Sequence, residues 1–218
     1  MKSKILTLLA VGLLTGPMAA SAVMVTWEAT GAITNVNESI PALGPVSVGD
    51  PYVVTWSFDS DAPLLFVREG GSFAPGKRYD YDPSSLQMWL RIGANPAIHL
   101  TYAMIPLGRL WLRDNSGDQR VDGQPADGIT FSLFMPGIGD VSLIFRGTDL
   151  DMVTGPGLPT DPYPGLASLP VSNFQISPGL AGSEMISVRR VFVPEPGTLA
   201  LLGLGLAGLG LSRRRRAA

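Results

Sequence analysis

Residues 51–59 read Pro-Tyr-Val-Val-Thr-Trp-Ser-Phe-Asp, and this stretch decides the fold class. Its large apolar side chains stand at every second position, at Tyr52, Val54, Trp56 and Phe58. Successive side chains of a β-strand point to opposite faces of the sheet, so a period of two is typical of a strand that buries one face. We therefore expect residues 51–59 to form a strand with one face in a core.

Runs of the same kind recur between residues 23 and 193, separated by turns rich in Gly, Pro and Asp. The expected strands cover residues 25–36, 51–59, 86–92, 97–104, 109–113, 129–135, 141–145 and 185–193, and residues 136–140 form a hairpin loop between two of them. The sequence has no alternation of strands with helices, which argues against a parallel sheet. It predicts an all-β domain over residues 23–193, an antiparallel β-sandwich or jelly-roll-like fold.

Two segments, residues 60–84 and 151–182, are rich in Gly, Pro, Ser and Asp. This composition favours turns and irregular backbone. We expect both segments to be long surface loops. The second would serve as the rim or lid of a binding site, or else be a plain insertion.

Residues 1–22 have the build of a secretory signal peptide. Lys2 and Lys4 precede an apolar run over residues 5–14, and Ala20-Ser21-Ala22 forms a small-residue cleavage box. The apolar run is too short to cross a bilayer core of about 30 Å as a helix. We expect signal peptidase to cut after Ala22, although a buried first helix of the domain is the alternative.

The C-terminal segment, residues 194–218, has three parts. Pro194-Glu195-Pro196 comes first, an uncharged stretch of mostly Leu, Ala and Gly follows, and the basic residues Arg213, Arg214, Arg215 and Arg216 come near the end. We expect a short transmembrane helix over about residues 197–212, because a helix satisfies its backbone hydrogen bonds internally in lipid. By the positive-inside rule the four arginines form a cytoplasmic stop, which leaves residues 23–196 outside.

This order of parts, over about residues 193–218, resembles the PEP-CTERM sorting domain found in Gram-negative bacteria that make exopolysaccharide. The resemblance implies that an exosortase, a membrane enzyme, recognises Pro194-Glu195-Pro196 and cleaves near it. It also implies an exported protein that is anchored for a time in the inner membrane with its domain on the periplasmic side. After cleavage the domain would stay at the cell surface or in the extracellular matrix, among exopolysaccharide.

The charge of the expected domain differs from that of the whole chain. Two lysines lie in the leader and four arginines in the tail, so ten of the 16 basic residues belong to residues 23–193, against 17 of the 18 acidic residues. The net charge of this part is therefore −7, which argues against nucleic acid and anionic lipid as partners. The chain has no cysteine, which excludes disulfides and thiolate metal sites.

One acidic segment is a candidate for ion binding. Asp114, Asn115, Asp118 and Asp122 offer oxygen ligands within nine residues, and hard cations such as Ca²⁺ bind six to eight oxygens. The EF-hand spacing is absent, so the alternative is a surface loop in which Asp, Asn and Gly form turns. We expect no cofactor, with Ca²⁺ as the one ion that this segment would bind.

Other polar and aromatic residues are candidates for parts of a site. The carboxylate pairs Asp59/Asp61, Asp80/Asp82 and Asp149/Asp151 would suit a polysaccharide hydrolase, or else start turns. His99 is the only histidine, which argues against a Ser-His-Asp triad or a two-histidine metal site. Trp56, Trp89, Trp111, Tyr79 and Tyr81 would stack on sugar rings if exposed, and otherwise fill the core.

These patterns favour an exported surface or matrix protein without enzymatic activity. A carbohydrate- or calcium-binding surface module is the alternative, and a polysaccharide-acting enzyme is the third reading. Exposed aromatic side chains or a carboxylate-lined groove would favour the second or third.

Overall fold

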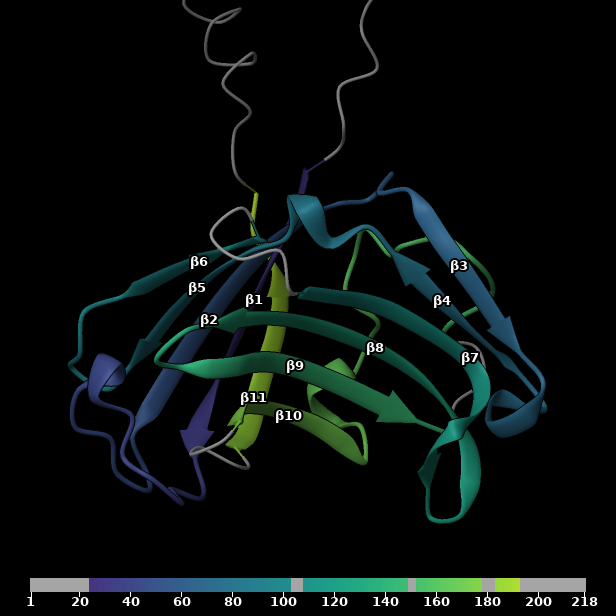
Figure 1. Cartoon of the computed structure of the whole chain (residues 1–218). Coiled ribbons are helices and arrows are strands. Elements are labelled where there is room, and N and C mark those ends of the chain that lie inside the picture. The colour runs from purple at the N-terminus through teal and green to yellow at the C-terminus, as the bar shows by residue number, and fades with distance from the viewer. Residues whose placement is uncertain (1–23, 103–107, 149–151, 178–182, 193–218) are drawn as a thin grey trace, which may run out of the picture.

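The alternating run at residues 51–59 forms strand β2 (Pro51–Asp59), as the sequence predicts, and β2 is the middle strand of a five-stranded sheet. The computed structural model describes residues 24–102, 108–148, 152–177 and 183–192. Within these residues the chain is all-β, with two antiparallel sheets (Figure 1). The predicted all-β class is therefore confirmed.

The five-stranded sheet has the order β11-β1-β2-β5-β6. Its strands are β11 (Ser183–Arg190), β1 (Met24–Ile33), β2, β5 (Gln87–Ile92) and β6 (Ile98–Thr101). The first and last strands of the described chain thus lie side by side, because β1 pairs with both β11 and β2.

The six-stranded sheet has the order β10-β9-β8-β7-β4-β3. Its strands are β10 (Val171–Ser177), β9 (Gly139–Gly147), β8 (Gln124–Met135), β7 (Gly108–Val121), β4 (Lys77–Tyr81) and β3 (Leu64–Glu69). Short 3-10 turns lie at Pro41–Leu43 (η1), Gly71–Phe73 (η2), Pro83–Ser85 (η3) and Leu166–Ser168 (η5). Figure 1 shows the long strands of this sheet running across those of the other.

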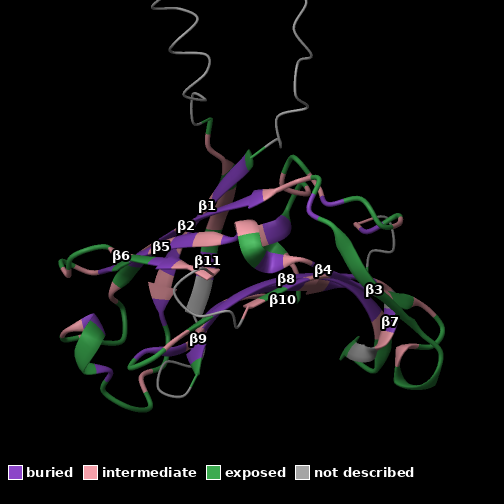
Figure 2. Ribbon diagram, turned by 45° about the horizontal axis from the view of Figure 1, so that its top comes forward, coloured by how far each residue is buried: buried purple, intermediate pink, exposed green. Residues whose placement is uncertain are grey.

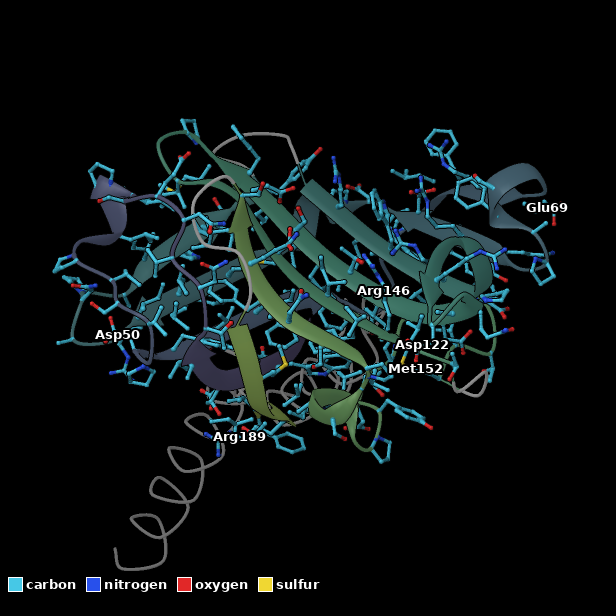
Figure 3. All side chains as sticks on the ribbon, turned by 90° about the horizontal axis from the view of Figure 1, so that it is seen from below. Asp50, Glu69, Asp122, Arg146, Met152 and Arg189 are labelled. Atoms are coloured by element: carbon cyan, nitrogen blue, oxygen red, sulfur yellow. The ribbon has the colours of Figure 1, made fainter. Side chains whose placement is uncertain are left out.

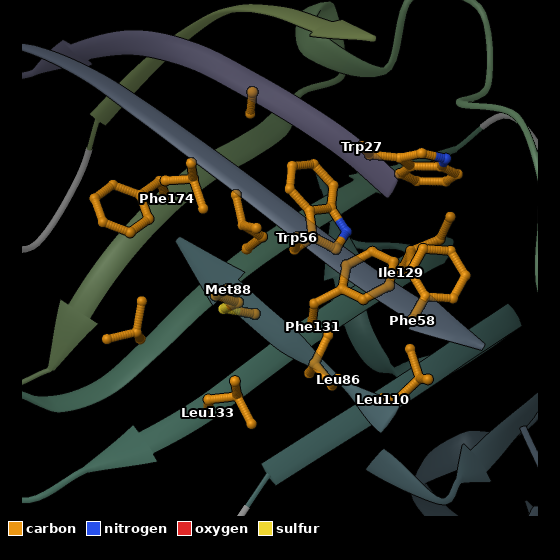
Figure 4. Close-up of a cluster of buried hydrophobic side chains, with 14 of the residues drawn as sticks. Trp27, Trp56, Phe58, Leu86, Met88, Leu110, Ile129, Phe131, Leu133 and Phe174 are labelled. Atoms are coloured by element: carbon orange, nitrogen blue, oxygen red, sulfur yellow. The ribbon is translucent and has the colours of Figure 1, made fainter. Parts of the chain in front are cut away.

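The core lies between the two sheets and is centred on aromatic rings (Figure 4). Trp27 packs edge-on against Phe58 at 5.5 Å and against Phe131 at 5.8 Å between ring centroids, so residues from both sheets meet. Trp56 and Phe58 are fully buried, as their alternation in β2 predicts. Figure 2 shows this buried layer, with the exposed residues mostly in the connections and at the edges.

The two predicted loops are corrected by the structure. Residues 60–84 contain the hairpin of β3 and β4, and residues 151–182 contain β10. Every side chain of β3 is exposed, so its residues show no alternation between buried and exposed positions. β10 buries Phe174 and Ile176 at alternate positions, a short pattern inside a segment rich in turn residues. A strand also extends past Arg113, because β7 continues to Val121.

The predicted signal peptide and the predicted C-terminal helix fall on residues 1–22 and 197–212, outside the described residues. Among the residues that are described, no helix has the length and apolar character needed to cross a membrane.

Candidate functional site

The last strand leads directly to the segment that the sequence singled out. β11 pairs with β1 through Trp27 and Arg190, and the Val191 N–H donates to the carbonyl oxygen of Thr26 at 2.8 Å. Backbone pairing therefore continues to within three residues of Pro194. Phe192, next along the chain, is 83% exposed.

The beginning of β1 lies at the same end of this sheet. Met24, its first residue, pairs with Asp59, the last residue of β2. β11 runs antiparallel to β1, so the start of β1 and the end of β11 are neighbours, as Figure 1 shows. The two terminal segments of the chain are thus attached at one end of the domain.

Charged side chains fasten the end of β11 to its surroundings. The Arg189 guanidinium donates from Nε and Nη2 to Glu28 Oε1 at 2.9 and 2.6 Å. Arg190 Nη1 donates to Asp161 Oδ1 at 2.9 Å, and the Arg190 guanidinium lies 5.1 Å from the centre of the Phe192 ring. These contacts hold the strand in place up to the exposed Phe192.

Residues 192–216 match the family model of the PEP-CTERM protein-sorting motif. The chain ends in a PEP-CTERM motif. This confirms the resemblance seen in the sequence, and it marks a protein that is exported and targeted to exosortase through a membrane-anchored sorting signal. No curated protein and no solved structure matches the chain.

The individual residues assigned to sorting lie outside the described residues. They are Ala22 at the expected signal cleavage site, Pro194, Glu195 and Pro196 of the motif, and Arg213, Arg214, Arg215 and Arg216 of the cytoplasmic stop. Their separate roles stay predictions.

The acidic segment is a strand and not the expected loop. Asp114, Asn115 and Asp118 lie in β7, and Asp122 lies in the turn between β7 and β8. Asp122 has a φ of 50° and Gly123 a φ of 78°, the geometry that an Asp-Gly hairpin turn adopts. No group of three or more metal-binding side chains occurs among the described residues, which do not include the Asp118 side chain. Calcium binding therefore stays a prediction.

The carboxylate pairs are used in local structure. Asp59 Oδ1 accepts from the Asp61 N–H at 2.9 Å, and Asp82 Oδ1 accepts from the Ser84 N–H at 2.9 Å and caps η3. In both contacts the aspartate starts a turn, which is the alternative to a hydrolase site that the sequence offers for these pairs. Asp80 instead pairs with arginines, and Asp149 and Asp151 lie outside the described residues.

The aromatic candidates divide between the core and the outer faces. Trp56, Tyr79 and Tyr81 are buried, whereas Trp89 is only partly buried and stacks on His99 at 4.5 Å. Burial raises the pKa of Tyr81 to about 12, and the neighbouring Tyr79 adds to the effect.

Trp111 lies on the outer face of the six-stranded sheet among arginines that come from two strands. The guanidinium carbons of Arg78, Arg109 and Arg113 lie 4.3, 5.0 and 5.0 Å from the centre of its ring. Arg109, Trp111 and Arg113 are two residues apart in sequence, so one strand places all three on one face. This spacing in the sequence could have shown that Arg109, Trp111 and Arg113 share a face. It could not have shown Arg78, which comes from β4.

At the edge of this sheet, Lys77 Nζ lies 3.0 Å from Glu69 Oε2 across the β3–β4 hairpin. The hydrogen bond and the negative charge of Glu69 raise the pKa of Lys77. Both side chains are largely exposed, so this pair contributes little to stability.

Proposed function

We propose that this chain is an exported surface protein that exosortase cleaves at its C-terminal motif and that then stays in the exopolysaccharide matrix. Signal peptidase removes residues 1–22, and a helix over about residues 197–212 anchors the precursor in the inner membrane. The arginines at 213–216 remain cytoplasmic, and the β-domain lies on the periplasmic side. The domain has no enzymatic activity in this proposal.

The observation that carries the proposal is the position of the motif relative to the fold. The family match begins at residue 192, directly after the last paired residue, Val191. The domain is thus followed at once by its sorting signal, with no further structural unit between them.

This short connection limits where cleavage takes place. Glu195 comes four residues after Val191, and an extended chain covers at most about 3.6 Å per residue. Glu195 therefore lies within about 14 Å of the sheet when the domain is folded. Exosortase has to act with the folded domain beside it, or before β11 pairs with β1.

Mass spectrometry of the C-terminus tests the proposal. The full chain is expressed in a host that has exosortase, next to a variant with Pro194, Glu195 and Pro196 all changed to Ala. We expect the wild-type protein to lose the segment after the motif and to leave the membrane fraction. The variant should keep residues 197–218 and remain in the membrane.

A host that lacks exosortase is the matched control, and there the wild-type chain should behave as the variant does. Identical C-termini and identical fractionation of the two proteins in the exosortase host would contradict the proposal.

A further inference from the structure

Four arginines stand in one cross-strand row on the outer face of the six-stranded sheet. Arg68 of β3 pairs with Arg78 of β4, and Arg78 pairs with Arg113 of β7. Arg113 then pairs with Gly128 of β8, and Gly128 pairs with Arg146 of β9. In Figure 3 the labelled Glu69, next to Arg68 in sequence, lies at one end of the molecule and Arg146 lies nearer the middle. The row therefore runs inward from the edge of the sheet.

A second row beside it holds the groups that make this arrangement stable. Like charges directly opposite each other destabilise an antiparallel pair, so the arginines need nearby partners. Asp80 Oδ2 accepts from Arg68 Nε at 3.0 Å, and Asp80 Oδ1 lies 3.2 Å from Arg78 Nη2. Asp80 is opposite Trp111, whose ring attracts three guanidinium groups.

Among the described residues of this face, basic side chains outnumber acidic ones. Arg109 lies on the same face, in the row that also holds Ser132 and Ser142, and Asp140 is its carboxylate neighbour at 3.9 Å. The face thus collects five of the ten basic residues of the domain, Arg68, Arg78, Arg109, Arg113 and Arg146. The described acidic residues beside these arginines are Asp80 and Asp140, and Arg113 and Arg146 make further contacts within the protein. The net charge of the domain is −7.

Two of these arginines have donors directed to solvent. The side chains of Arg68 and Arg109 are 50% and 55% exposed. Arg68 makes one hydrogen bond with the described residues, through Nε to Asp80, and Arg109 makes none. A guanidinium has five N–H donors in a planar fork that fits a carboxylate, so most of their donors remain for a ligand.

The spacing of the two arginines indicates an extended ligand. They are two strands apart, about 10 Å, and four residues apart along the sheet, about 13 Å, which separates their Cα atoms by about 16 Å. A polymer with repeated negative charges can contact both arginines and continue along the face. Phe66, 62% exposed, and Phe134, 40% exposed, flank this stretch with apolar surface on which sugar rings can pack.

We infer that the outer face of the six-stranded sheet binds a carboxylate-bearing acidic polysaccharide, with Arg68 and Arg109 as the residues that contact its carboxylates. The inference rests on the proposed export of the domain, which places it among polysaccharides. Double-stranded nucleic acid is disfavoured because its phosphates, about one per 1.7 Å of helix axis, are more closely spaced than the carboxylates of a polyuronate, so the rest of the acidic domain repels it more strongly. Arg78 and Asp80 act as positioning residues, because they hold Arg68 and Trp111 in place.

Native gels that contain sodium alginate, a polyuronate, test the inference on the protein purified after export. We expect alginate to retard the protein, neutral dextran to leave its mobility unchanged, and added salt to weaken the retardation. The double variant Arg68→Gln/Arg109→Gln should bind alginate at least about tenfold more weakly, since it loses two charge-assisted contacts.

The double variant Arg91→Gln/Arg120→Gln is the matched control, because it removes the same charge from exposed residues away from these rows. It should bind as the wild type does. Arg109→Gln alone repeats the test if the double variant fails to fold, and it should bind several-fold more weakly.

Equal binding by the two double variants, equal retardation by dextran, or stronger retardation by single-stranded DNA would overturn the inference. The C-terminal mass of the same preparations reports on processing separately. A correctly processed protein that ignores alginate would leave the proposed function standing and remove the binding site.

Discussion

Tyr81 lies at the end of β4 with its side chain in the core and only 4% exposed. Its hydroxyl group is buried and has no hydrogen-bond partner among the described residues. A buried hydroxyl without a partner costs free energy, because it has given up its hydrogen bonds to water. The same burial raises the pKa of Tyr81 to about 12.

We predict that Tyr81→Phe raises the free energy of unfolding by about 1 kcal/mol at neutral pH. The folded state holds the Tyr81 proton more tightly than the unfolded state, whose pKa is about 10. The stability that the folded state gains from the neutral, protonated Tyr81 is complete below pH 10. It is lost as the pH rises toward 12, because the unfolded state then releases the proton first. The advantage of the Phe variant should therefore grow by about a further 1 kcal/mol at pH 11.

Urea unfolding of both proteins at pH 8 and pH 11 measures this difference. Tyr79→Phe, one pleat away on the same strand, controls for the loss of a hydroxyl in itself and should show no such gain. A difference between wild type and Tyr81→Phe that stays constant with pH would mean that Tyr81 is not shielded from water.

At the scale of elements, the sequence predicted strands well where alternation reports burial. β2 alternates because Tyr52, Val54, Trp56 and Phe58 fill the space between the sheets. β3 was missed because both of its faces are exposed, so its side chains carry no pattern. The outer part of β7 was missed because Asp, Asn and Gly suggest turns, whereas pairing with β8 keeps this segment extended.

The lack of a local pattern also limits what could be predicted of the site. The sorting motif is continuous in sequence and was recognisable as such. The arginine row joins β3, β4, β7 and β9, and only the register of the sheet aligns those residues. Cross-strand neighbours of this kind are set by tertiary pairing, which no local pattern records.

The contact between η2 and β7 supplies a prediction at this scale. A Cβ atom at Gly117 would collide with the carbonyl oxygen of Ala74 and lie 2.9 Å from that of Ser72. Backbone cannot yield as a flexible side chain does, so Gly117→Ala should push the η2 segment away from β7. We expect a loss of about 1–3 kcal/mol in the free energy of unfolding.

Gly157→Ala is the matched control, because a Cβ at Gly157 has nothing within 4 Å. Thermal or urea unfolding compares the two variants, and limited proteolysis reports whether residues 70–76 become accessible. A Gly117→Ala protein as stable and as resistant as the control would show that this close approach does not exist in solution.

At the scale of the whole molecule, the two functional regions lie on different parts of the fold. The sorting motif follows β11 of the five-stranded sheet, next to the start of β1. The arginine row lies on the outer face of the other sheet. Attachment at one end of the domain would thus leave that face open to a polymer.

This arrangement predicts that additions to the domain affect processing according to their position. A small folded reporter domain placed between the signal peptide and Met24 would crowd the end of the sheet where the motif begins. The same reporter in the hairpin turn at Asp122–Gly123 would lie well away from that end, as Figures 1 and 3 show. We expect the first fusion to lower the processed fraction several-fold and the second to leave it near the wild-type value.

Pulse-labelling in a host with exosortase measures the processed fraction of each fusion over time. Signal-peptide removal is scored in the same samples, so that a failure of export is not mistaken for a failure of sorting. If both fusions are processed at the wild-type rate, exosortase acts before β1 and β11 pair. The cleavage step then precedes the folding of the five-stranded sheet, because a paired β11 holds Glu195 of the motif within about 14 Å of that sheet.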